Sequence, residues 1–251
     1  MDNEKRPKLF IATPMYGGMC TAHYVQGLLL TIQKLRSVGV GVQWAQMTNE
    51  SLITRARNEL TRQFLASDCD YMMFIDADIG FDGQAVATLL AADRDITCGI
   101  YSKKEINWGA VEAAAKIGQE NLADHAGAYV LNMVEGSESA TTDEDGMFEV
   151  RHGGTGFMLI KRRVFDRLKP EVPTYRISSQ KNPDTGDYLK PLTYEFFATS
   201  IDESGALLSE DYHFCELWRK NEGKIYACPF IPLQHVGSYV FGGDILKSGA
   251  N

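Results

Sequence analysis

The sequence predicts an α/β fold in which helices flank an open, mostly parallel sheet. Apolar runs alternate with segments of helical spacing through residues 1–101, which is the pattern of consecutive strand–helix–strand units. Two aspartates follow directly after one of these runs, at the point where such sheets bind their ligands. With 251 residues, 44% of them apolar, the chain is long enough to build a large packed core.

The first part of the chain carries the clearest element pattern. The apolar run 8–13 predicts a buried strand, and the glycines after Pro14 predict a loop at its end. Helical spacing of apolar residues then alternates with short apolar runs. Helices are expected at residues 21–37, 51–66 and 84–92, and further strands at residues 40–47, 71–75 and 96–101.

After residue 101 the regular alternation is lost. Strands are expected at residues 129–133 and 147–152, on either side of a polar hairpin loop at 135–146, and again at 157–160 and 224–227. Helices are expected at residues 161–168 and 210–221, the second with Ser209 as its N-cap. Residues 170–208 are rich in proline and aromatic side chains, which predicts an irregular, flexible cover over a substrate.

Composition excludes several classes of partner and site. The net charge of -8, with no run of basic residues, argues against binding to a nucleic-acid backbone. Five cysteines without a C-x-x-C pair argue against a disulfide framework or a zinc site. The charged N-terminus and the lack of a long apolar window predict a protein without a signal peptide or membrane span, in a bacterial cytoplasm or that of a virus-infected host.

Asp76 and Asp78 follow the apolar run YMMFI and are candidate metal ligands. Hard oxygen ligands suit Mg²⁺ or Mn²⁺, and such an ion completes its shell with substrate phosphates and water. The simpler alternative is that aspartates favour turns. His235, which precedes Gly237, is a candidate third ligand through an imidazole nitrogen, although single histidines are more often structural.

Four segments, in the same order, resemble the family-2-like group of GT-A glycosyltransferases. They are Thr13-Pro14 at the end of the first strand, Arg57-Asn58 followed by YMMFIDAD, the glycine-rich GGTGFMLIKR at 153–162, and SEDYHFCELWRKNEGKIYACPFIPLQHVG at 209–237. The resemblance covers most of the chain. It implies a GT-A fold, which is an open mixed, mostly parallel sheet flanked by helices with a smaller acceptor-side subregion. The fold would form a single domain over residues 1–251, with a nucleotide-sugar-binding half at 1–101 and an acceptor-binding, catalytic half at 102–251.

The resemblance also implies which residues bind each substrate. The donor site would comprise Thr13, Pro14, Tyr16, Arg57, Asn58, Asp76, Ala77 and Asp78. The acceptor side would comprise Gly154, Thr155, Gly156, Phe157 and Trp218. The first strand lacks the acidic residue that grips uracil in this group, so the nucleotide stays open. No membrane segment follows the acidic helix, which argues against a processive synthase. The fold group transfers many sugars, so the sugar and the acceptor stay open as well.

These residues suggest a division of chemical roles. Asp78 would bind the metal, Asp76 the metal or the donor ribose, and His235 would complete the site, so that the ion stabilises the departing diphosphate. Arg57 would orient the donor. Asp211 is the candidate base that deprotonates the acceptor hydroxyl in an inverting reaction, with Glu210 as the second candidate. A retaining reaction would give Asp211 a different role. The helix dipole alone also favours acidic residues at this position and lowers their basicity.

Alternative functions remain open at this stage. A sugar nucleotidyltransferase would share the sheet, the metal and the diphosphate chemistry, but ATPMYGGM lacks the basic residue usual in its first loop. A non-catalytic module that binds nucleotide sugars or carbohydrates would not need both the metal cluster and Glu210-Asp211. The acceptor could also be a modified DNA base, against which the negative net charge counts mildly. The oligomeric state is not predicted.

Overall fold

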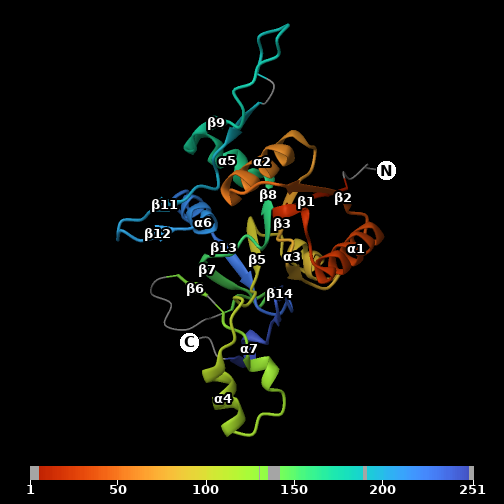
Figure 1. The fold of residues 1–251 in the computed structure, drawn as a ribbon. Helices are drawn as coiled ribbons and strands as arrows, with labels where there is room; N and C mark the ends of the chain where they lie inside the picture. Colours follow the sequence, from red (N-terminus) through yellow and green to blue (C-terminus); the bar gives the residue numbers. More distant parts are fainter. Residues whose placement is uncertain (1–5, 130, 135–141, 189–190, 249–251) are drawn as a thin grey trace.

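The computed structural model describes residues 6–129, 131–134, 142–188 and 191–248, and in these residues the core is an eight-stranded sheet with the order β2-β1-β3-β8-β5-β13-β7-β6 (Figure 1). The predicted α/β class, an open sheet flanked by helices, is confirmed. The strands are β1 Lys8–Met15, β2 Gly41–Thr48, β3 Tyr71–Ile75, β5 Ile96–Gly99, β6 Asn132–Met133, β7 Phe148–His152, β8 Phe157–Lys161 and β13 Ile225–Cys228.

The sheet is mixed because β8 lies at its centre. β1 pairs in parallel with β2 and β3, and β5 pairs in parallel with β13. β8 runs antiparallel between β3 and β5 and joins the two parallel groups. Its residues from Phe157 to Ile160 are buried, as a central strand covered on both faces requires. β7 also runs antiparallel, against β13.

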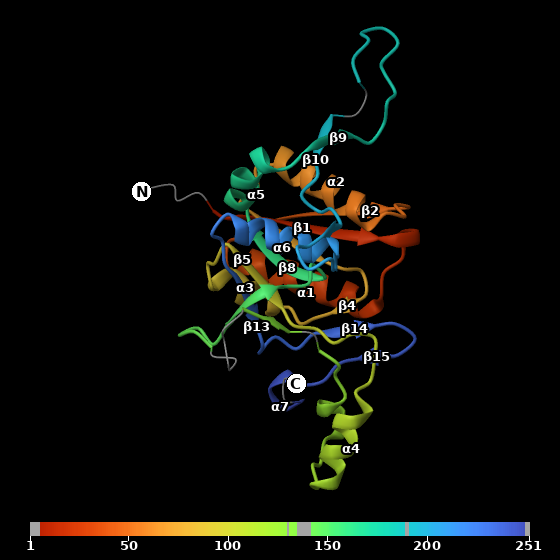
Figure 2. The same cartoon turned by 90° about the vertical axis from the view of Figure 1, so that its left-hand side faces the viewer.

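Helices cover both faces of the sheet, and each face has its own apolar core. Successive residues of β1 point to opposite faces. Phe10 packs with Phe64 and Phe165 under α2 (Ile53–Ala66), α5 (Arg162–Leu168) and α6 (Glu210–Lys220). Leu9 packs with Tyr24 and Leu89 over α1 (Ala22–Ser37) and α3 (Ala85–Ala91). In Figure 2, α2 and α5 accordingly lie above β1, and α1 and α3 lie below it.

A smaller group of elements, not predicted from the sequence, lies beyond the end of β3. It contains a three-stranded sheet of β4 (Ile79–Gly80), β14 (Gln234–Val236) and β15 (Val240–Phe241). The helices α4 (Trp108–Lys116), η2 (Leu122–His125) and α7 (Ile245–Ser248) belong to the same region (Figure 1). Short strands of two or three residues leave little periodic signal, so only their tertiary pairing defines them.

Residues 170–208 are more ordered than the sequence suggests. They contain two hairpins, β9 (Thr174–Arg176) with β10 (Leu192–Tyr194) and β11 (Ser200–Ile201) with β12 (Leu207–Leu208). Phe196 and Phe197, between the hairpins, are fully buried in the core. The prediction of a wholly irregular segment is therefore wrong, because an apolar pair anchors it and local turns pair its strands.

The strand and hairpin loop predicted between residues 129 and 146 are only partly covered by the described residues. The strand expected at 129–133 is reduced to β6, and residues 130 and 135–141 of the expected strand and loop lie outside the described residues. Cys20 is exposed, the other four cysteines are buried, and none forms a disulfide. Among the described residues, none of the helices combines the length and apolar character that crossing a membrane requires.

Candidate active site

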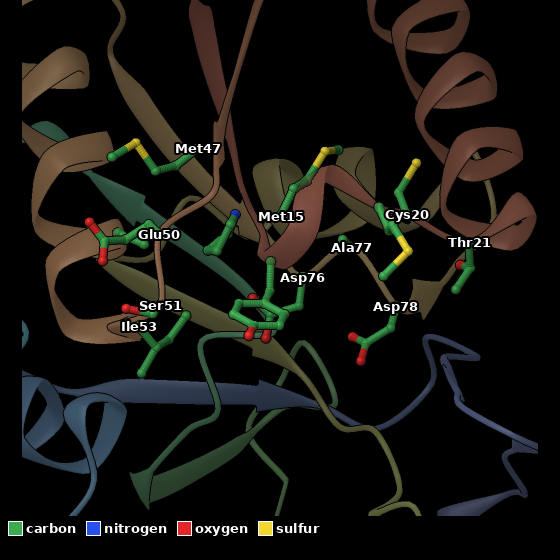
Figure 3. Close-up of a pocket in the computed structure, with 14 residues that line it drawn as sticks. Met15, Cys20, Thr21, Met47, Glu50, Ser51, Ile53, Asp76, Ala77 and Asp78 are labelled. Atoms are coloured by element: carbon green, nitrogen blue, oxygen red, sulfur yellow. The ribbon is translucent and has the colours of Figure 1, made fainter.

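A cavity of about 390 Å³ opens at the carboxyl ends of β1 and β3, the edge where open α/β sheets bind ligands. Figure 3 shows Glu50 and Ser51 on one side of this β1–β3 cavity and Cys20 on the other, with Asp76 between them and Asp78 below Cys20. The predicted donor residues that line it are Pro14, Tyr16, Asp76, Ala77 and Asp78. The cavity therefore brings together most of the donor set that the sequence singles out.

Arg57 of α2 is 3% exposed and binds two carboxylates at the edge of this cavity. Its two terminal nitrogens donate to Asp76 at 3.1 and 3.2 Å, and its Nε donates to Glu210 at 3.0 Å. Burial by itself lowers the pKa of Arg57, but the two carboxylates outweigh it and raise the pKa above its usual range. The guanidinium thus ties α2, the end of β3 and the start of α6 together.

Asp78 and His235 meet at the wall of the cavity. β14 pairs with β4 so that His235 lies opposite Ile79, and the backbone N–H of Val236 donates to the Asp78 carbonyl at 2.8 Å. His235 Nε2 is 3.5 Å from Asp78 Oδ2, and Lys104 Nζ is 2.6 Å from the same oxygen. Burial raises the pKa of Asp78, but the hydrogen bonds from His235 and Lys104 outweigh it and lower the pKa to about 2.

The tautomer of His235 fits metal binding. Its Nδ1 lies 3.0 Å from the backbone carbonyl of Ser102, and because a carbonyl oxygen only accepts, Nδ1 carries the hydrogen. Nε2 is the nitrogen that faces Asp78. A hydrogen on Nε2 is donated to the carboxylate, and when that hydrogen is absent the Nε2 lone pair can bind a metal ion beside Asp78. Asp78 and His235 together offer one oxygen and one nitrogen ligand, a set that a divalent ion would complete with phosphates and water.

Asp76 does not face the same point. Both of its oxygens accept from Arg57. Within the described residues, no group of three or more histidine, cysteine, aspartate or glutamate side chains converges closely enough to hold a metal ion. The three-ligand set predicted from the sequence is therefore not assembled in this structure, and only the pair Asp78 and His235 is close.

A second cavity, of about 180 Å³, lies between the ends of β5 and β7 and the start of α6. Asp211 and His235 line this β5–β7 cavity, as does Gly154. Asn132 donates to the Tyr212 hydroxyl at 2.6 Å, and the His152 and Tyr212 rings stack 4.2 Å apart. Because Asp78 lines the first cavity and His235 the second, this pair of side chains lies between the two cavities.

Asp211 is the carboxylate of the second cavity. The Ser209 hydroxyl donates to its Oδ1, and the Tyr212 N–H donates to the same oxygen at 2.9 Å. Ser209 occupies the N-cap position but makes no capping bond to the backbone of α6. Burial is the main cause that raises the pKa of Asp211, with Ser209 opposing it. Its neighbour Glu210 is bound to Arg57.

The glycine-rich loop between β7 and β8 is shaped around Tyr101. A Cβ at Gly154 would lie 2.3 Å from the Tyr101 hydroxyl, and a Cβ at Gly156 would lie 2.6 Å from it. The Gly156 N–H donates to that hydroxyl at 3.2 Å, and the Gly156 carbonyl accepts from the Asp76 N–H at 2.9 Å. Gly156 thus contacts one residue from each cavity. Neither glycine can be replaced by a larger residue without displacing Tyr101.

Several predicted site residues lie in the core rather than on a cavity wall. Thr13, Thr155 and Phe157 are buried, and Trp218 is 3% exposed in the core beneath α6. Asn58 pairs with the backbone N–H and carbonyl of Phe197 at 2.9 and 3.1 Å, which uses both ends of its side-chain amide. None of these five lines either of the two cavities. That these five residues contact a substrate stays a prediction. The contacts observed for them are with other residues of the protein.

Sequence reasoning missed other residues of the site. They are Glu50 in the first cavity, Tyr101, Lys103, Asn132, His152 and Tyr212 in the second, and Lys104 on Asp78. A signal existed for the lysines, which follow the strand expected at 96–101 and so fall at the ligand-binding edge of the sheet. His152 likewise ends a strand directly before the glycine-rich loop.

Comparisons with known proteins identify no family for this chain. No protein-family model matches the sequence, and no curated protein matches it significantly. Among solved structures, the chain is similar to the crystal structure of S. aureus TarS 1-349, with a TM-score of 0.40 and 11% identity over 94% of this chain. It spans only 60% of that TarS chain. Function therefore has to be argued from the site.

Proposed function

We propose that this protein is a glycosyltransferase that moves a sugar from a nucleoside-diphosphate sugar to an acceptor hydroxyl. The observation that carries the proposal is the position of Asp78 and His235, whose side chains are 3.5 Å apart, between the two cavities. A transfer reaction needs a donor and an acceptor held on either side of one reacting atom. Two cavities on either side of a candidate metal-binding pair satisfy that need.

The β1–β3 cavity suits the donor. Its volume of about 390 Å³ lies within the range of small-molecule sites. Tyr16 and Ile53 line it with exposed apolar side chains, 75% and 40% exposed, against which a nucleobase could stack. Asp78 lies at the sheet edge, where the diphosphate would be held. Mn²⁺ or Mg²⁺ bound there would supply the positive charge that stabilises the departing diphosphate.

The β5–β7 cavity suits the acceptor. With about 180 Å³ it accommodates a single ring-sized group rather than a long oligosaccharide. Asp211 is the proposed base for the attacking hydroxyl, and its raised pKa makes it a stronger base than an ordinary aspartate. Glu210, bound to Arg57 at 3.0 Å, is not free for this role, so we favour Asp211 over Glu210.

Arg57 has a positioning role in this proposal. Its guanidinium is buried against Asp76 and Glu210, so it orients the carboxylates of the site rather than touching the donor. Both oxygens of Asp76 accept hydrogen bonds from Arg57, and this ion pair holds the Asp76 carboxylate away from Asp78 and His235. We therefore propose Asp78 and His235 as the protein ligands of the metal.

The decisive experiment is donor binding and slow donor hydrolysis across a panel of nucleotide sugars with Mn²⁺ or Mg²⁺. We expect one donor to bind in a metal-dependent way, and Asp78→Ala to weaken that binding at least about 100-fold, because a direct metal ligand is lost. Asp166→Ala is the matched control, because Asp166 is 51% exposed on α5 and pairs with Lys169 directly after that helix.

The other outcomes separate the alternatives. If pyrophosphate is released from a nucleoside triphosphate and a sugar phosphate, the protein is a nucleotidyltransferase. If a donor binds but is never hydrolysed or transferred to any acceptor, including DNA with hydroxylated bases, it is a binding module. If no donor binds under any metal condition, the proposed function is wrong.

A further inference from the structure

Lys104 is the cation in contact with Asp78. It lies in the segment after β5, where the N–H of its neighbour Lys103 donates to the Ala128 carbonyl at 2.8 Å. Its stem packs over Gly237, where an added Cβ would come within 3.3 Å of the lysine Cδ. The backbone hydrogen bond of Lys103 and the contact with Gly237 therefore direct the Lys104 ammonium to the Asp78 carboxylate. At 43% exposure, the side chain also has room to move.

The oxygen that Lys104 contacts is the one a metal would need. Asp78 Oδ2 lies 2.6 Å from Lys104 Nζ and 3.5 Å from His235 Nε2. An ion held by Asp78 and His235 would have to bind between this oxygen and this nitrogen. A divalent cation and an ammonium at one carboxylate oxygen repel each other, so they exclude one another.

One divalent ion does not neutralise all the charge that builds on the nucleoside diphosphate as it departs from the sugar. A nucleoside diphosphate with two ionised phosphates carries more than two negative charges, so a second cation in reach strengthens its binding. Arg57 does not supply this second cation, because it is buried and bound to Asp76 and Glu210. Lys104 is half-exposed next to Asp78, on a flexible stem that ends in a compact charge.

We propose that Lys104 is the resident counter-cation of Asp78, that it competes with the divalent ion for this carboxylate, and that it binds the diphosphate of the donor when the ion is present. This inference rests on the proposed function, because it assigns a further binding residue to the same site. It makes metal and nucleotide binding cooperative, since the ion releases the ammonium that the nucleotide then uses.

The first test measures Mn²⁺ binding alone by calorimetry, for the native protein, Lys104→Met and Lys116→Met. Methionine removes the charge of Lys104 and keeps an unbranched stem over Gly237. We expect Lys104→Met to bind Mn²⁺ about fivefold more tightly, the range of a partly exposed ion pair. Lys116→Met should bind like the native protein, because Lys116 is 71% exposed and pairs with Glu112 on α4, outside both cavities. Equal or weaker binding by Lys104→Met overturns the competition.

The second test measures binding of UDP, GDP, CDP and ADP at saturating Mn²⁺. We expect Lys104→Met to bind the preferred nucleotide about tenfold more weakly than the native protein, because one charge-assisted contact is lost. Lys116→Met again serves as the control. If both lysine variants bind the nucleotide like the native protein, Lys104 does not contact the diphosphate.

The outcomes distinguish this inference from the proposed function. If the native protein binds Mn²⁺ and nucleotide but Lys104→Met changes neither affinity, the inference fails and the transferase proposal stands. If Lys104→Met binds Mn²⁺ where the native protein does not, the competition is supported directly. If Mn²⁺ binds to neither protein, the metal site of the proposed function fails and takes the inference with it.

Discussion

Asp211 and Asp78 illustrate, at the scale of single residues, how surroundings set the chemistry of identical side chains. Burial raises the pKa of Asp211, whereas contacts with His235 and Lys104 lower that of Asp78 to about 2. Asp78 is therefore ionised at pH values well above about 2. Asp211 gains its charge only as the pH rises through its raised pKa, so the proposed base limits activity on the acidic side.

A substitution at Ser209 tests this assignment. The hydroxyl of Ser209 donates to Asp211 and lowers its pKa. In Ser209→Ala the pKa of Asp211 rises further, and we expect the acidic limb of kcat/KM against pH to move to higher pH. The measurement is the pH profile of transfer or donor hydrolysis. Ser204→Ala, which removes a contact to Asp202 in an exposed hairpin, is the control. An unmoved limb would mean that another group sets it.

At the scale of secondary-structure elements, one buried guanidinium connects two helices and a strand. α2 supplies Arg57, the end of β3 supplies Asp76 and the first turn of α6 supplies Glu210. Backbone contacts add to this junction, because the Asp76 N–H donates to Gly156 before β8 at 2.9 Å. Removing one partner of a buried ion pair leaves the others uncompensated, which costs more than the pair itself contributes.

Arg57→Met measures that cost. We expect it to lower the free energy of unfolding by about 3 to 5 kcal/mol, because the carboxylates of Asp76 and Glu210 lose their shared counter-charge. Arg163→Met is the matched control, because Arg163 is 68% exposed beside Asp95, and its loss should cost no more than about 1 kcal/mol. Denaturant titration of both variants gives the values. A loss equal to that of the control would show that the clamp is not stabilising.

The position of β8 decides how the molecule holds together as a whole. β8 comes from the second half of the sequence, yet it separates β3 from β5, which belong to the first half. β13, near the end of the chain, then extends the sheet beyond β5. The two halves expected from the sequence, 1–101 and 102–251, therefore share one sheet and both apolar cores.

Native-state hydrogen exchange tests whether the halves unfold together. We expect amides of β3 and β13 to exchange with the same opening free energy, which is the global stability of about 5 to 15 kcal/mol. The β9–β10 hairpin extends away from the body in Figure 1 and provides a reference for local opening. Exchange of β13 at a much lower opening energy than β3 would mean that the second half unfolds separately.

The amino-acid sequence by itself determined the elements with a clear period and the position of the acidic pair. Helices α1, α2 and α6 and strands β1 and β3 fall close to their predicted ranges, because apolar spacing is a local property. Asp76 and Asp78 lie at the sheet edge for the same reason, since they directly follow the apolar strand β3.

Only the tertiary structure decided which side chains meet. Arg57 binds Glu210 across 153 residues, and Asp78 is contacted by Lys104 from the segment after β5 and by His235 from β14. These partners depend on the strand order, above all on the antiparallel entry of β8, and on short strands such as β14 that leave no periodic signal. Local patterns contain no information on such long-range pairs, so the tertiary structure alone shows that Asp76 faces an arginine while Asp78 faces a histidine and a lysine.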